Sequence, residues 1–289
     1  MKKIYIKNEN NDYQYFETLK KNRTKRHSNG EFFVEGVRNI NEAFNPGNNW
    51  EINSLIYPDR NISDWAKNII NVFFDNEKTG DNKKLYPLNK ELMDKLSDKE
   101  DEQSRSEIII TVKMKSDNIQ NLKLNKNSSV LIFDRPSNKG NLGTIIRTCD
   151  SFGIDALILT GHGVDLYDSE TIRATMGSFF RQKVITEPSF KEIASWTENQ
   201  KNLFDGLKIS GTSAKTTKPS VMLNHETFSK DVPSIVVIGN ETTGMSERFY
   251  GLCDNLIRIP MIEGSSASSL NVSCAASIIL YEIYNKKIK

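Results

Sequence analysis

Cysteine is scarce in this chain of 289 residues, which contains only three. Cys149, Cys253 and Cys274 lie far apart and include no Cys-x-x-Cys pair, so the sequence indicates neither a disulfide framework nor a zinc knuckle. We expect three buried, reduced thiols. The three histidines are too widely spaced to form a recognisable metal motif, so we expect no metal.

Long apolar runs are absent as well. No segment approaches the roughly 20 apolar residues that a membrane-spanning helix needs. The opening residues, MKKIYIK, lack the apolar core of a signal peptide. We therefore expect a cytoplasmic protein with no membrane contact.

An excess of charge of one sign is also missing. The 39 Lys and Arg residues nearly balance the 37 Asp and Glu residues, and the net charge of +2 does not by itself indicate nucleic-acid binding. The local distribution is uneven, because an early basic run contains Lys20, Lys21, Arg23, Lys25, Arg26 and His27. Such a run is either a solvated helix face or a phosphate-binding surface.

Several common ligand motifs are missing. Gly140, Gly143 and Gly153 do not form the Gly-x-Gly-x-x-Gly fingerprint, and no Lys-Ser or Lys-Thr pair directly follows them as a phosphate loop requires. A Gly-x-Ser-x-Gly elbow is absent too. The sequence therefore disfavours a conventional dinucleotide or ATP site and a hydrolase triad.

The first part of the chain alternates short apolar strands with helices. After an extended start and a basic helix up to Gly30, we expect strands at 32–34, 52–57, 72–74 and 107–114, and helices at 36–44, 62–72 and 89–96. This alternation predicts a small α/β domain over residues 1–114. The polar, weakly patterned residues 115–129 are expected to form a linker.

The second part, residues 130–289, repeats a strand–helix pattern. We expect strands at 130–133, 156–159, 207–210, 234–238 and 256–259, and helices at 142–152, 169–176, 189–202 and 269–286. Strands alternating with helices predict a largely parallel sheet with helices on both sides. The predicted fold class is therefore α/β in both domains.

Residues 128–153 form the centre of this second domain. They read as an apolar strand, a polar loop with Gly140, and a helix that carries Arg147 on its first turns. Open α/β sheets bind ligands at the carboxyl ends of strands, where backbone N–H groups converge. Arg147 is therefore the leading candidate for the chemistry, although an ordinary surface arginine fits the same pattern.

Three segments at predicted strand ends carry distinctive residues: 134–148 (DRPSNKGNLGTIIRT), 238–245 (IGNETTGM), and 259–261 (IPM) leading to 269–273 (SLNVS). Together and in this order they resemble the motifs of the SpoU-type RNA ribose 2′-O-methyltransferases of the SPOUT superfamily. Residues 22–26 (NRTKR) and 33–36 (FVEG) resemble the start of the substrate-binding domain of ribosomal-RNA members, a small α/β module similar to certain ribosomal proteins. The sequence departs from the family pattern in the third motif, where the segment 263–268 is a little longer than in many relatives and would alter the shape of the cofactor lid.

The resemblance implies a SPOUT-type parallel sheet with a C-terminal trefoil knot, preceded by the RNA substrate-binding domain. It also implies S-adenosylmethionine as cofactor, RNA as partner, no metal, and a homodimer whose active sites draw on both chains. Periodicity predicts neither the knot nor the dimer, because knots are rare in protein folds.

The resemblance further implies five catalytic residues: Arg147, Asn141, Glu241, Ser269 and Asn271. Arginine is a poor proton acceptor because its pKa lies above about 12, so we favour Arg147 as the group that binds the RNA phosphate and stabilises the developing alkoxide. The family proposal of arginine as general base stays open. Read alone, Asn141 is a turn or cap residue, Glu241 a solvated carboxylate and Ser269 a helix N-cap. Given the motifs, we favour Asn141 as a group that binds substrate or holds the loop, and Glu241 as the group that orients Arg147 or Asn141.

Cofactor and RNA contacts follow from the same resemblance. The adenosyl group is expected near Gly239, Ile259 and Leu270, with Thr212 as a further candidate. The RNA-binding candidates are the basic side chains of Lys21, Arg23, Lys25 and Arg26.

The expected function is methylation of a ribose 2′-hydroxyl, most simply in ribosomal RNA. One alternative is a transfer-RNA 2′-O-methyltransferase, which the separate front domain disfavours. The other is a non-catalytic RNA-binding or ribosome-assembly factor, which the presence of Arg147, Glu241 and Asn271 disfavours. The target nucleotide, a housekeeping or antibiotic-resistance role, and the chain that supplies Arg147 stay open.

Overall fold

A computed structural model of the chain describes residues 2–75, 83–97, 106–212, 218–224, 226–264, 266–267 and 269–288. The chain forms two compact units. Unit 1 contains Met1–Lys115 and Asp165–Arg181, and unit 2 contains Ser116–Val164 and Gln182–Lys289.

This division differs from the predicted domains in two places. The segment 165–181, which the sequence analysis assigned to the second domain, packs in unit 1, where the Trp50 indole N–H donates a 2.9 Å hydrogen bond to the carbonyl of Phe180. Residues 116–129, expected to be a linker, belong to unit 2, because Ile119 and Leu122 are buried in its core. Two apolar side chains three positions apart suffice to anchor a segment that is polar on average.

Unit 1 is built on a five-stranded mixed sheet with the strand order β1-β4-β3-β5-β2. Strands β1, β3 and β4 run parallel, whereas β5 runs antiparallel to both β3 and β2. The strands are β1 (Lys2–Lys3), β2 (Glu31–Glu35), β3 (Ile52–Pro58), β4 (Lys84–Leu88) and β5 (Ile109–Lys113).

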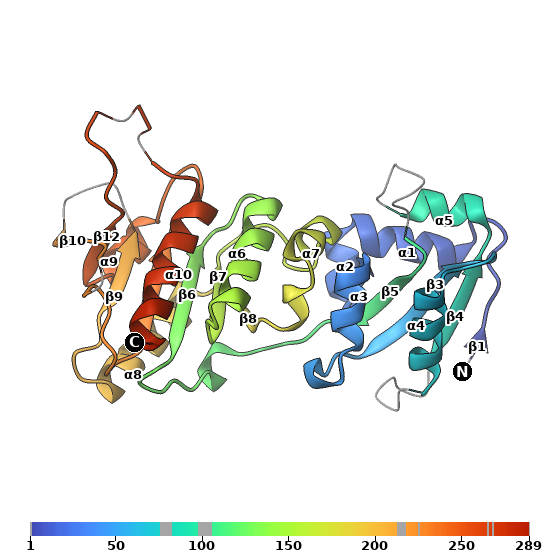
Figure 1. Cartoon of the computed structure of the whole chain (residues 1–289), viewed down its shortest axis with the longest axis horizontal. Helices are drawn as coiled ribbons and strands as arrows, with labels where there is room; N and C mark the ends of the chain where they lie inside the picture. Colours follow the sequence, from blue (N-terminus) through green and yellow to red (C-terminus); the bar gives the residue numbers. More distant parts are fainter. Residues whose placement is uncertain are drawn as a thin grey trace. The chain divides into compact units, whose positions relative to one another are not determined.

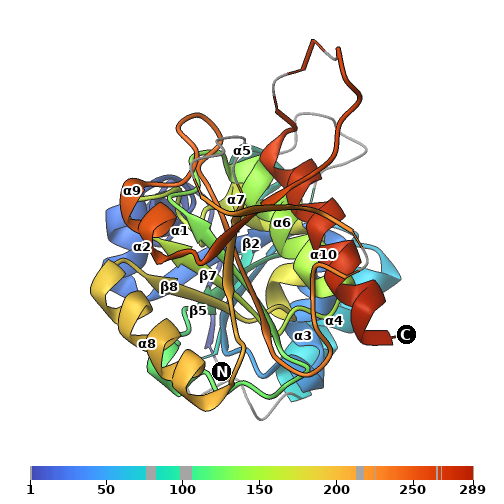
Figure 2. The same ribbon diagram turned by 90° about the vertical axis from the view of Figure 1, so that its left-hand side faces the viewer.

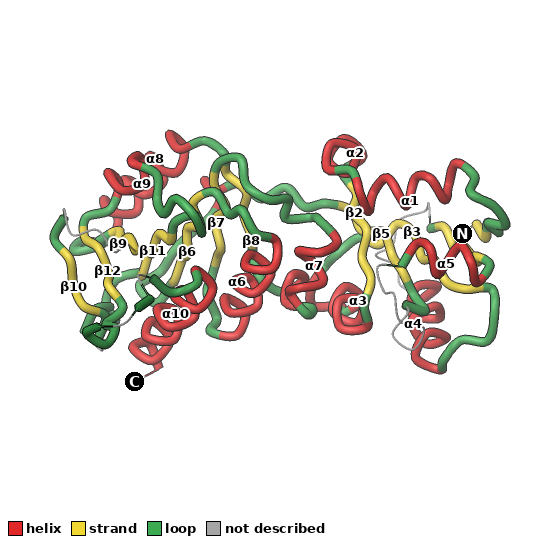
Figure 3. The backbone as a smooth tube through the Cα atoms, turned by 90° about the horizontal axis from the view of Figure 1, so that it is seen from above, coloured by secondary structure: helices red, strands yellow, loops and turns green. Residues whose placement is uncertain are grey.

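The helices of unit 1 cover both faces of this sheet, with α1 on one side and α3 and α4 on the other (Figure 3). Phe16 and Leu19 of α1 and Leu92 of α5 pack against Phe33 and Ile56 of the sheet. Burial of these side chains is the main driving force for folding of this unit. The helices are α1 (Asn11–Lys21), α2 (Arg23–Asn29), α3 (Val37–Phe44), α4 (Asp64–Asp75), α5 (Lys90–Leu96) and α7 (Ser169–Thr175).

Unit 2 is built on a seven-stranded sheet with the order β10-β12-β9-β11-β6-β7-β8, in which every neighbouring pair is parallel. The carboxyl ends of the strands therefore lie along one edge. The strands are β6 (Ser129–Asp134), β7 (Ala156–Thr160), β8 (Val184–Glu187), β9 (Ile209–Thr212), β10 (Ser220–Met222), β11 (Ser234–Ile238) and β12 (Asn255–Arg258). The predicted parallel sheet is confirmed, and the trefoil knot stays a prediction.

Helices α6 (Lys139–Ser151) and α10 (Val272–Ile288) cover one face of this sheet, and α8 (Phe190–Leu203) and α9 (Glu247–Leu252) cover the other (Figure 3). Helices α6 and α10 lie side by side (Figures 1 and 2), and the hydroxyls of Thr148 and Ser277 are 3.3 Å apart between them. No described helix combines the length and the apolar character that a membrane crossing requires.

Four local predictions were wrong or incomplete. Residues 72–74 lie inside α4 and not in a strand, because the apolar run continues the helical spacing of Ala66 and Ile69. Strands β4, β8 and β10 were not predicted. Helix α10 begins at Val272, three residues after the predicted start. Cys149 and Cys253 are buried as expected, but Cys274 is exposed on the outer side of α10.

Candidate active site

The carboxyl ends of β6 and β11 bring two loops of unit 2 together. Phe133 of β6 is paired with Ile238 of β11, so residues 135–138 and 239–246 leave the sheet side by side. Helix α6 begins at the end of the first loop, where the Asn138 side chain accepts a 2.9 Å hydrogen bond from the backbone N–H of Asn141. This is the usual N-cap geometry, and it fixes the position of Asn141 on the first turn.

Glu241 bridges these two loops. One carboxylate oxygen accepts hydrogen bonds from the backbone N–H (2.9 Å) and the hydroxyl (2.6 Å) of Ser137, and the other accepts one from the N–H of Asn138 at 3.1 Å. Partial burial opposes ionisation, but the hydrogen bonds from the hydroxyl and N–H of Ser137 outweigh it and hold the pKa of Glu241 below its usual value. Glu241 is therefore a carboxylate at neutral pH that fastens the loop before α6.

Asn141 connects Glu241 to the third motif. Its Nδ2 group donates to Oε1 of Glu241 at 3.4 Å, and its Oδ1 accepts from Nδ2 of Asn271 at 3.3 Å. Asn271 also caps α10, because its Oδ1 accepts from the N–H (2.8 Å) and the hydroxyl (2.6 Å) of Ser273. The structure thus joins Glu241, Asn141 and Asn271, one from each motif, in a single hydrogen-bonded chain, which we call the motif chain.

Arg147 and Ser269 stand outside the motif chain. Arg147 follows Asn141 by six residues on α6, and a helix turns by about 100° per residue, so the two side chains point to different sides of the helix. The guanidinium is exposed and forms no hydrogen bond or ion pair within the described part of the chain. Glu241 thus contacts Asn141 and not Arg147. Ser269 is exposed and precedes α10, which Asn271 caps in its place.

The predicted cofactor residues gather at the ends of three neighbouring strands. Thr212 ends β9, Gly239 follows β11 and Ile259 follows β12, and these strands are adjacent in the sheet order β12-β9-β11. Thr212 and Ile259 are half-buried, and Leu270 is partly exposed. The half-buried Ile259 side chain beside the backbone of three strand ends would suit an adenosyl group, which needs an apolar wall and polar main-chain partners.

Gly239 is required by the shape of its loop. The loop doubles back so tightly that a Cβ atom on Gly239 would collide with the backbone of Gly244 and Met245. Asn240 and Gly244 exchange two backbone hydrogen bonds, of 3.1 and 3.0 Å, which close residues 240–244 into a small hairpin. We call this segment the motif-2 hairpin.

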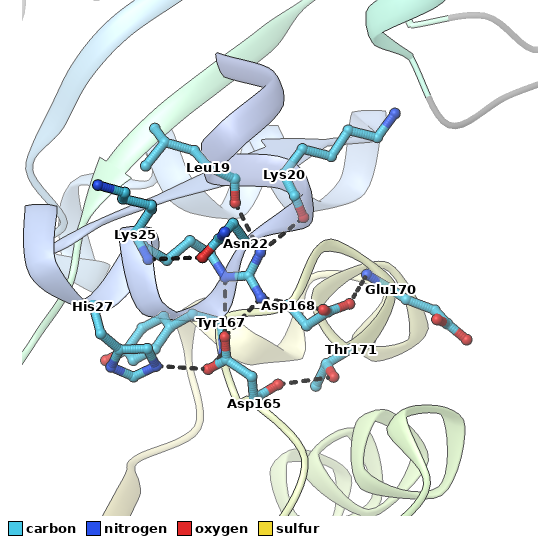
Figure 4. Close-up of polar contacts among 11 residues, drawn as sticks. Leu19, Lys20, Asn22, Lys25, His27, Asp165, Tyr167, Asp168, Glu170 and Thr171 are labelled. Carbon is cyan, nitrogen blue, oxygen red and sulfur yellow. Dashed lines mark hydrogen bonds and ion pairs between the residues drawn. The ribbon is translucent and has the colours of Figure 1, made fainter. Parts of the chain in front are cut away.

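Among the RNA-binding candidates in unit 1, Arg26 is wrongly assigned. Its side chain is only 1% exposed and uses all five N–H groups: Nε and Nη2 donate to Asp165 at 2.9 and 2.8 Å, Nη2 also donates to Asp168 at 3.2 Å, and Nη1 donates to the carbonyls of Leu19 and Lys20 at 2.8 Å each. Figure 4 shows these acceptors together with His27, whose Nε2 lies 2.9 Å from Asp165. A guanidinium held in this way cannot reach a phosphate.

The other three basic candidates lie at the surface. Lys21 is exposed and pairs with Glu17 one helical turn away at 2.8 Å, and the side chains of Arg23 and Lys25 are exposed on α2. Asn22 caps α2 by accepting from the N–H of Lys25 at 3.0 Å, and this cap stabilises the helical turn that carries Arg23 and Lys25. Their assignment as RNA contacts stays a prediction.

Sequence reasoning missed three residues that build this site. Ser137 and Asn138 supply the donors that hold Glu241, and Asp134 at the end of β6 is a buried carboxylate. The Ser-Asn pair before an apolar helix was a visible capping signal. Nothing local marked Asp134 as a site residue, because the Thr160 and Ser246 groups that it binds lie 26 and 112 residues away. No described group of three or more His, Cys, Asp or Glu residues is arranged to hold a metal ion.

The fold and the site define an α/β protein whose motif residues meet at the carboxyl edge of a parallel sheet. The SpoU rRNA Methylase family matches residues 128–281, and the SpoU L30e-like domain matches residues 10–110. The chain is 32% identical over 286 residues to the 23S rRNA (uridine(2479)-2′-O)-methyltransferase of Streptomyces viridochromogenes. This match covers 98% of this chain and 92% of that protein. The chain therefore belongs to the SpoU rRNA methylase family.

Solved structures agree with this assignment. The crystal structure of the SpoU methyltransferase AviRb from Streptomyces viridochromogenes, in complex with the cofactor AdoMet, has a TM-score of 0.79 and 31% identity, and the match covers 96% of this chain and 99% of that one. An AdoMet-bound rRNA methyltransferase from Sinorhizobium meliloti, at 22% identity, shares the fold with a TM-score of 0.81 and covers 98% of both chains.

Proposed function

We propose that this chain transfers a methyl group from S-adenosylmethionine to a ribose 2′-hydroxyl of ribosomal RNA. The motif chain of Glu241, Asn141 and Asn271 carries the proposal. It joins three motifs that are far apart in the sequence at the carboxyl edge of the sheet of unit 2. Alignment with a 23S rRNA 2′-O-methyltransferase over nearly the whole chain supports ribosomal RNA as the substrate class. We infer a cytoplasmic location from that substrate.

The chemistry requires a positioned and activated hydroxyl. S-adenosylmethionine supplies an electrophilic methyl group, so a carbon–oxygen bond forms while the carbon–sulfur bond breaks and the hydroxyl loses its proton. The residues of this chain hold the ribose in line and favour the transfer of that proton to water. Glu241 and Asn271 fix the Asn141 amide, whose second Nδ2 hydrogen is directed to the ribose.

Arg147 provides the positive charge in this proposal. Its guanidinium stays protonated, binds the phosphate next to the target ribose, and stabilises the alkoxide that develops on the 2′-oxygen. Because Arg147 points away from Asn141 within one chain, it serves the active site of a second copy.

The surface of unit 2 offers a face for that second copy. Ile278, Tyr281 and Tyr284 of α10 are 39%, 49% and 38% exposed. The ring of Phe152, at the end of α6, lies 5.9 Å from that of Tyr281 and 5.8 Å from that of Tyr284. Contiguous exposed apolar side chains mark interaction surfaces, so a homodimer forms through α6 and α10, next to Arg147.

The remaining assignments complete the proposal. Gly239, Ile259, Leu270 and Thr212 hold the cofactor at the ends of β11, β12 and β9. Unit 1, which matches the SpoU L30e-like domain, binds the RNA, and exposed Lys21, Arg23 and Lys25 contact its phosphates. Ser269, exposed before α10 and two residues from Asn271, is the remaining candidate for a substrate contact.

The deciding experiment measures transfer of labelled methyl groups from S-adenosylmethionine to ribosomal RNA and to transfer RNA. We expect labelling of ribosomal RNA at a ribose 2′-oxygen, located by mass spectrometry. Arg147→Ala should abolish transfer while cofactor binding, measured by calorimetry, persists. Labelling of transfer RNA alone would support the alternative substrate. Cofactor binding without transfer to either RNA would refute the proposal.

Mixing two inactive variants tests which chain supplies the arginine. In a symmetric dimer with Arg147 acting across the interface, a heterodimer of Arg147→Ala and Asn271→Ala has one complete site. Random exchange of subunits should then restore up to about a quarter of the wild-type rate. No recovery in heterodimers verified by mass spectrometry would show that Arg147 acts within its own chain.

A further inference from the structure

Asp134 is a buried carboxylate at the end of the central strand β6. Its side chain is 1% exposed. Oδ1 accepts from the hydroxyl of Thr160, the last residue of β7, at 3.1 Å, and Oδ2 accepts from the backbone N–H of Ser246 at 2.7 Å. Since β6 lies between β11 and β7, one side chain connects the end of β7 to the loop that follows β11.

Arg135 extends this connection. Its Nε and Nη2 groups donate to the two carboxylate oxygens of Asp134, each at 3.1 Å, and Nη2 also donates to the carbonyl of Gly244 at 3.2 Å. The carbonyl of Arg135 accepts from Nδ2 of Asn240 at 2.7 Å. Arg135 therefore holds both ends of the motif-2 hairpin.

The backbone geometry around Arg135 is unusual. Its φ of 54° lies in the left-handed region, which non-glycine residues adopt only where the surroundings enforce it. On the β7 side, a Cβ atom at Gly161 would lie 2.8 Å from Cγ of Arg135, so glycine leaves the room that the arginine side chain occupies. The N–H of Val164 donates to the carbonyl of Pro136 at 2.8 Å and closes the same side.

A purely structural role explains this arrangement poorly. The end of a parallel strand needs no buried carboxylate, and an apolar side chain would pack there without the cost of removing a charge from water. Asp134 instead supplies hydrogen bonds of defined direction. It fixes the backbone N–H of Ser246, just after the motif-2 hairpin, and it orients the Arg135 guanidinium, which donates to the carbonyl of Gly244. The loop that it binds through Ser246, residues 239–246, carries both Gly239 and Glu241.

We propose that Asp134 and Arg135 are positioning residues for methyl transfer, which form the motif-2 hairpin into its cofactor-binding shape before the cofactor arrives. This inference rests on the proposed cofactor site at Gly239. Pre-organised loops lower the ordering cost of binding, so the bonds that hold the hairpin should appear as cofactor affinity.

Three weakening substitutions and one restoring substitution test the inference in the full-length protein, with S-adenosylmethionine affinity measured by calorimetry. Asp134→Asn keeps the shape of the side chain but turns an N–H group toward the donors that surround it. We expect S-adenosylmethionine to bind at least about tenfold more weakly. Thr160→Val removes one donor and should weaken binding, whereas Thr160→Ser keeps the hydroxyl and should restore it. Asn240→Asp keeps the acceptor for the N–H groups of Thr242 and Thr243 but loses the donor to Arg135, and should also weaken binding.

Asp155→Asn is the matched control. Asp155 accepts a 2.7 Å hydrogen bond from the backbone N–H of Ser129, the first residue of β6. The substitution therefore makes the same chemical change at the amino end of the strand, far from the proposed cofactor site. We expect Asp155→Asn to lower the melting temperature and to leave cofactor affinity unchanged. A merely structural Asp134 would behave in the same way.

The outcomes separate the inference from the proposed function. Failure of the wild type to bind S-adenosylmethionine would overturn the cofactor site itself. If the wild type binds and Asp134→Asn, Thr160→Val and Asn240→Asp bind equally well, the positioning role is overturned. If Asp134→Asn does not fold, Asn240→Asp and the Thr160 pair decide: weaker binding that Thr160→Ser restores supports the inference, and unchanged binding overturns it.

Discussion

Replacing Glu241 with glutamine should weaken the active site without changing its volume. The carboxylate accepts three hydrogen bonds of 2.6 to 3.1 Å from Ser137 and Asn138, and glutamine offers one acceptor oxygen where glutamate offers two. Hydrogen bonds to a charged group contribute about 1.5–3 kcal/mol. Because Glu241 is half-exposed, we take the lower end and expect unfolding free energy to fall by about 1–2 kcal/mol.

The pH dependence of this effect has a defined sign. The pKa of Glu241 lies below its ordinary value in the folded protein, so the unfolded chain binds the proton more readily. The stabilisation is therefore complete above the ordinary glutamate pKa, about 4.3, and disappears as pH falls through the lower folded pKa. The stability difference between wild type and Glu241→Gln should accordingly shrink on acidification below that value.

Urea unfolding at neutral and acid pH measures this difference, and methyl transfer measures its effect on activity. We expect kcat to fall about tenfold, because Asn141 loses its fixed acceptor. Glu192→Gln is the control: Glu192 accepts a 3.1 Å hydrogen bond from Gln120 at the surface of α8, and we expect a change within about 0.5 kcal/mol. Equal stability at neutral pH, or a difference that does not vary with pH, would refute the reasoning.

Two further predictions concern buried contacts. Arg26→Met leaves Asp165 without its buried cation and should destabilise the protein by about 3–5 kcal/mol in urea unfolding, whereas Lys21→Met, which breaks an exposed pair, should change stability by less than about 1 kcal/mol. Equal effects would contradict the burial argument. Gly239→Ala forces a Cβ atom against the backbone of Met245 and should cost about 1–3 kcal/mol of stability together with cofactor binding, which calorimetry would show; an alanine variant that binds normally would contradict it.

Short-range features of both units could be predicted from the sequence. Helices α7 and α8 begin within one residue of their predicted starts, where Asp168 and Ser189 cap them by accepting from the N–H groups of Glu170 and Glu192. Strand β11 has its predicted bounds, and α3 and β3 lie within one residue of theirs. Caps and apolar spacing depend on neighbours within a few residues, so these signals are complete in the local sequence.

The domain boundary and the role of Arg26 could not be predicted in this way. Arg26 belongs to a basic run that suggests a surface, and its partner Asp165 is 139 residues further along the chain. Segment 165–181 has an ordinary helix signal, and nothing local shows that it packs in unit 1. Only chain topology decides which distant carboxylate meets a given cation.

The stretch 128–153 shows the same limit within the candidate active site. The sequence by itself determined a strand, a polar loop and a helix there, and it marked Asn141 and Arg147 as candidates. The tertiary structure alone decided that Asn141 joins Glu241 and Asn271, that Arg147 points away from them, and that Asp134 ties the loops of three neighbouring strands. The reason is physical: helix caps and apolar periods act over a few residues, whereas a site at a sheet edge is assembled by strand order, which no short stretch of sequence specifies.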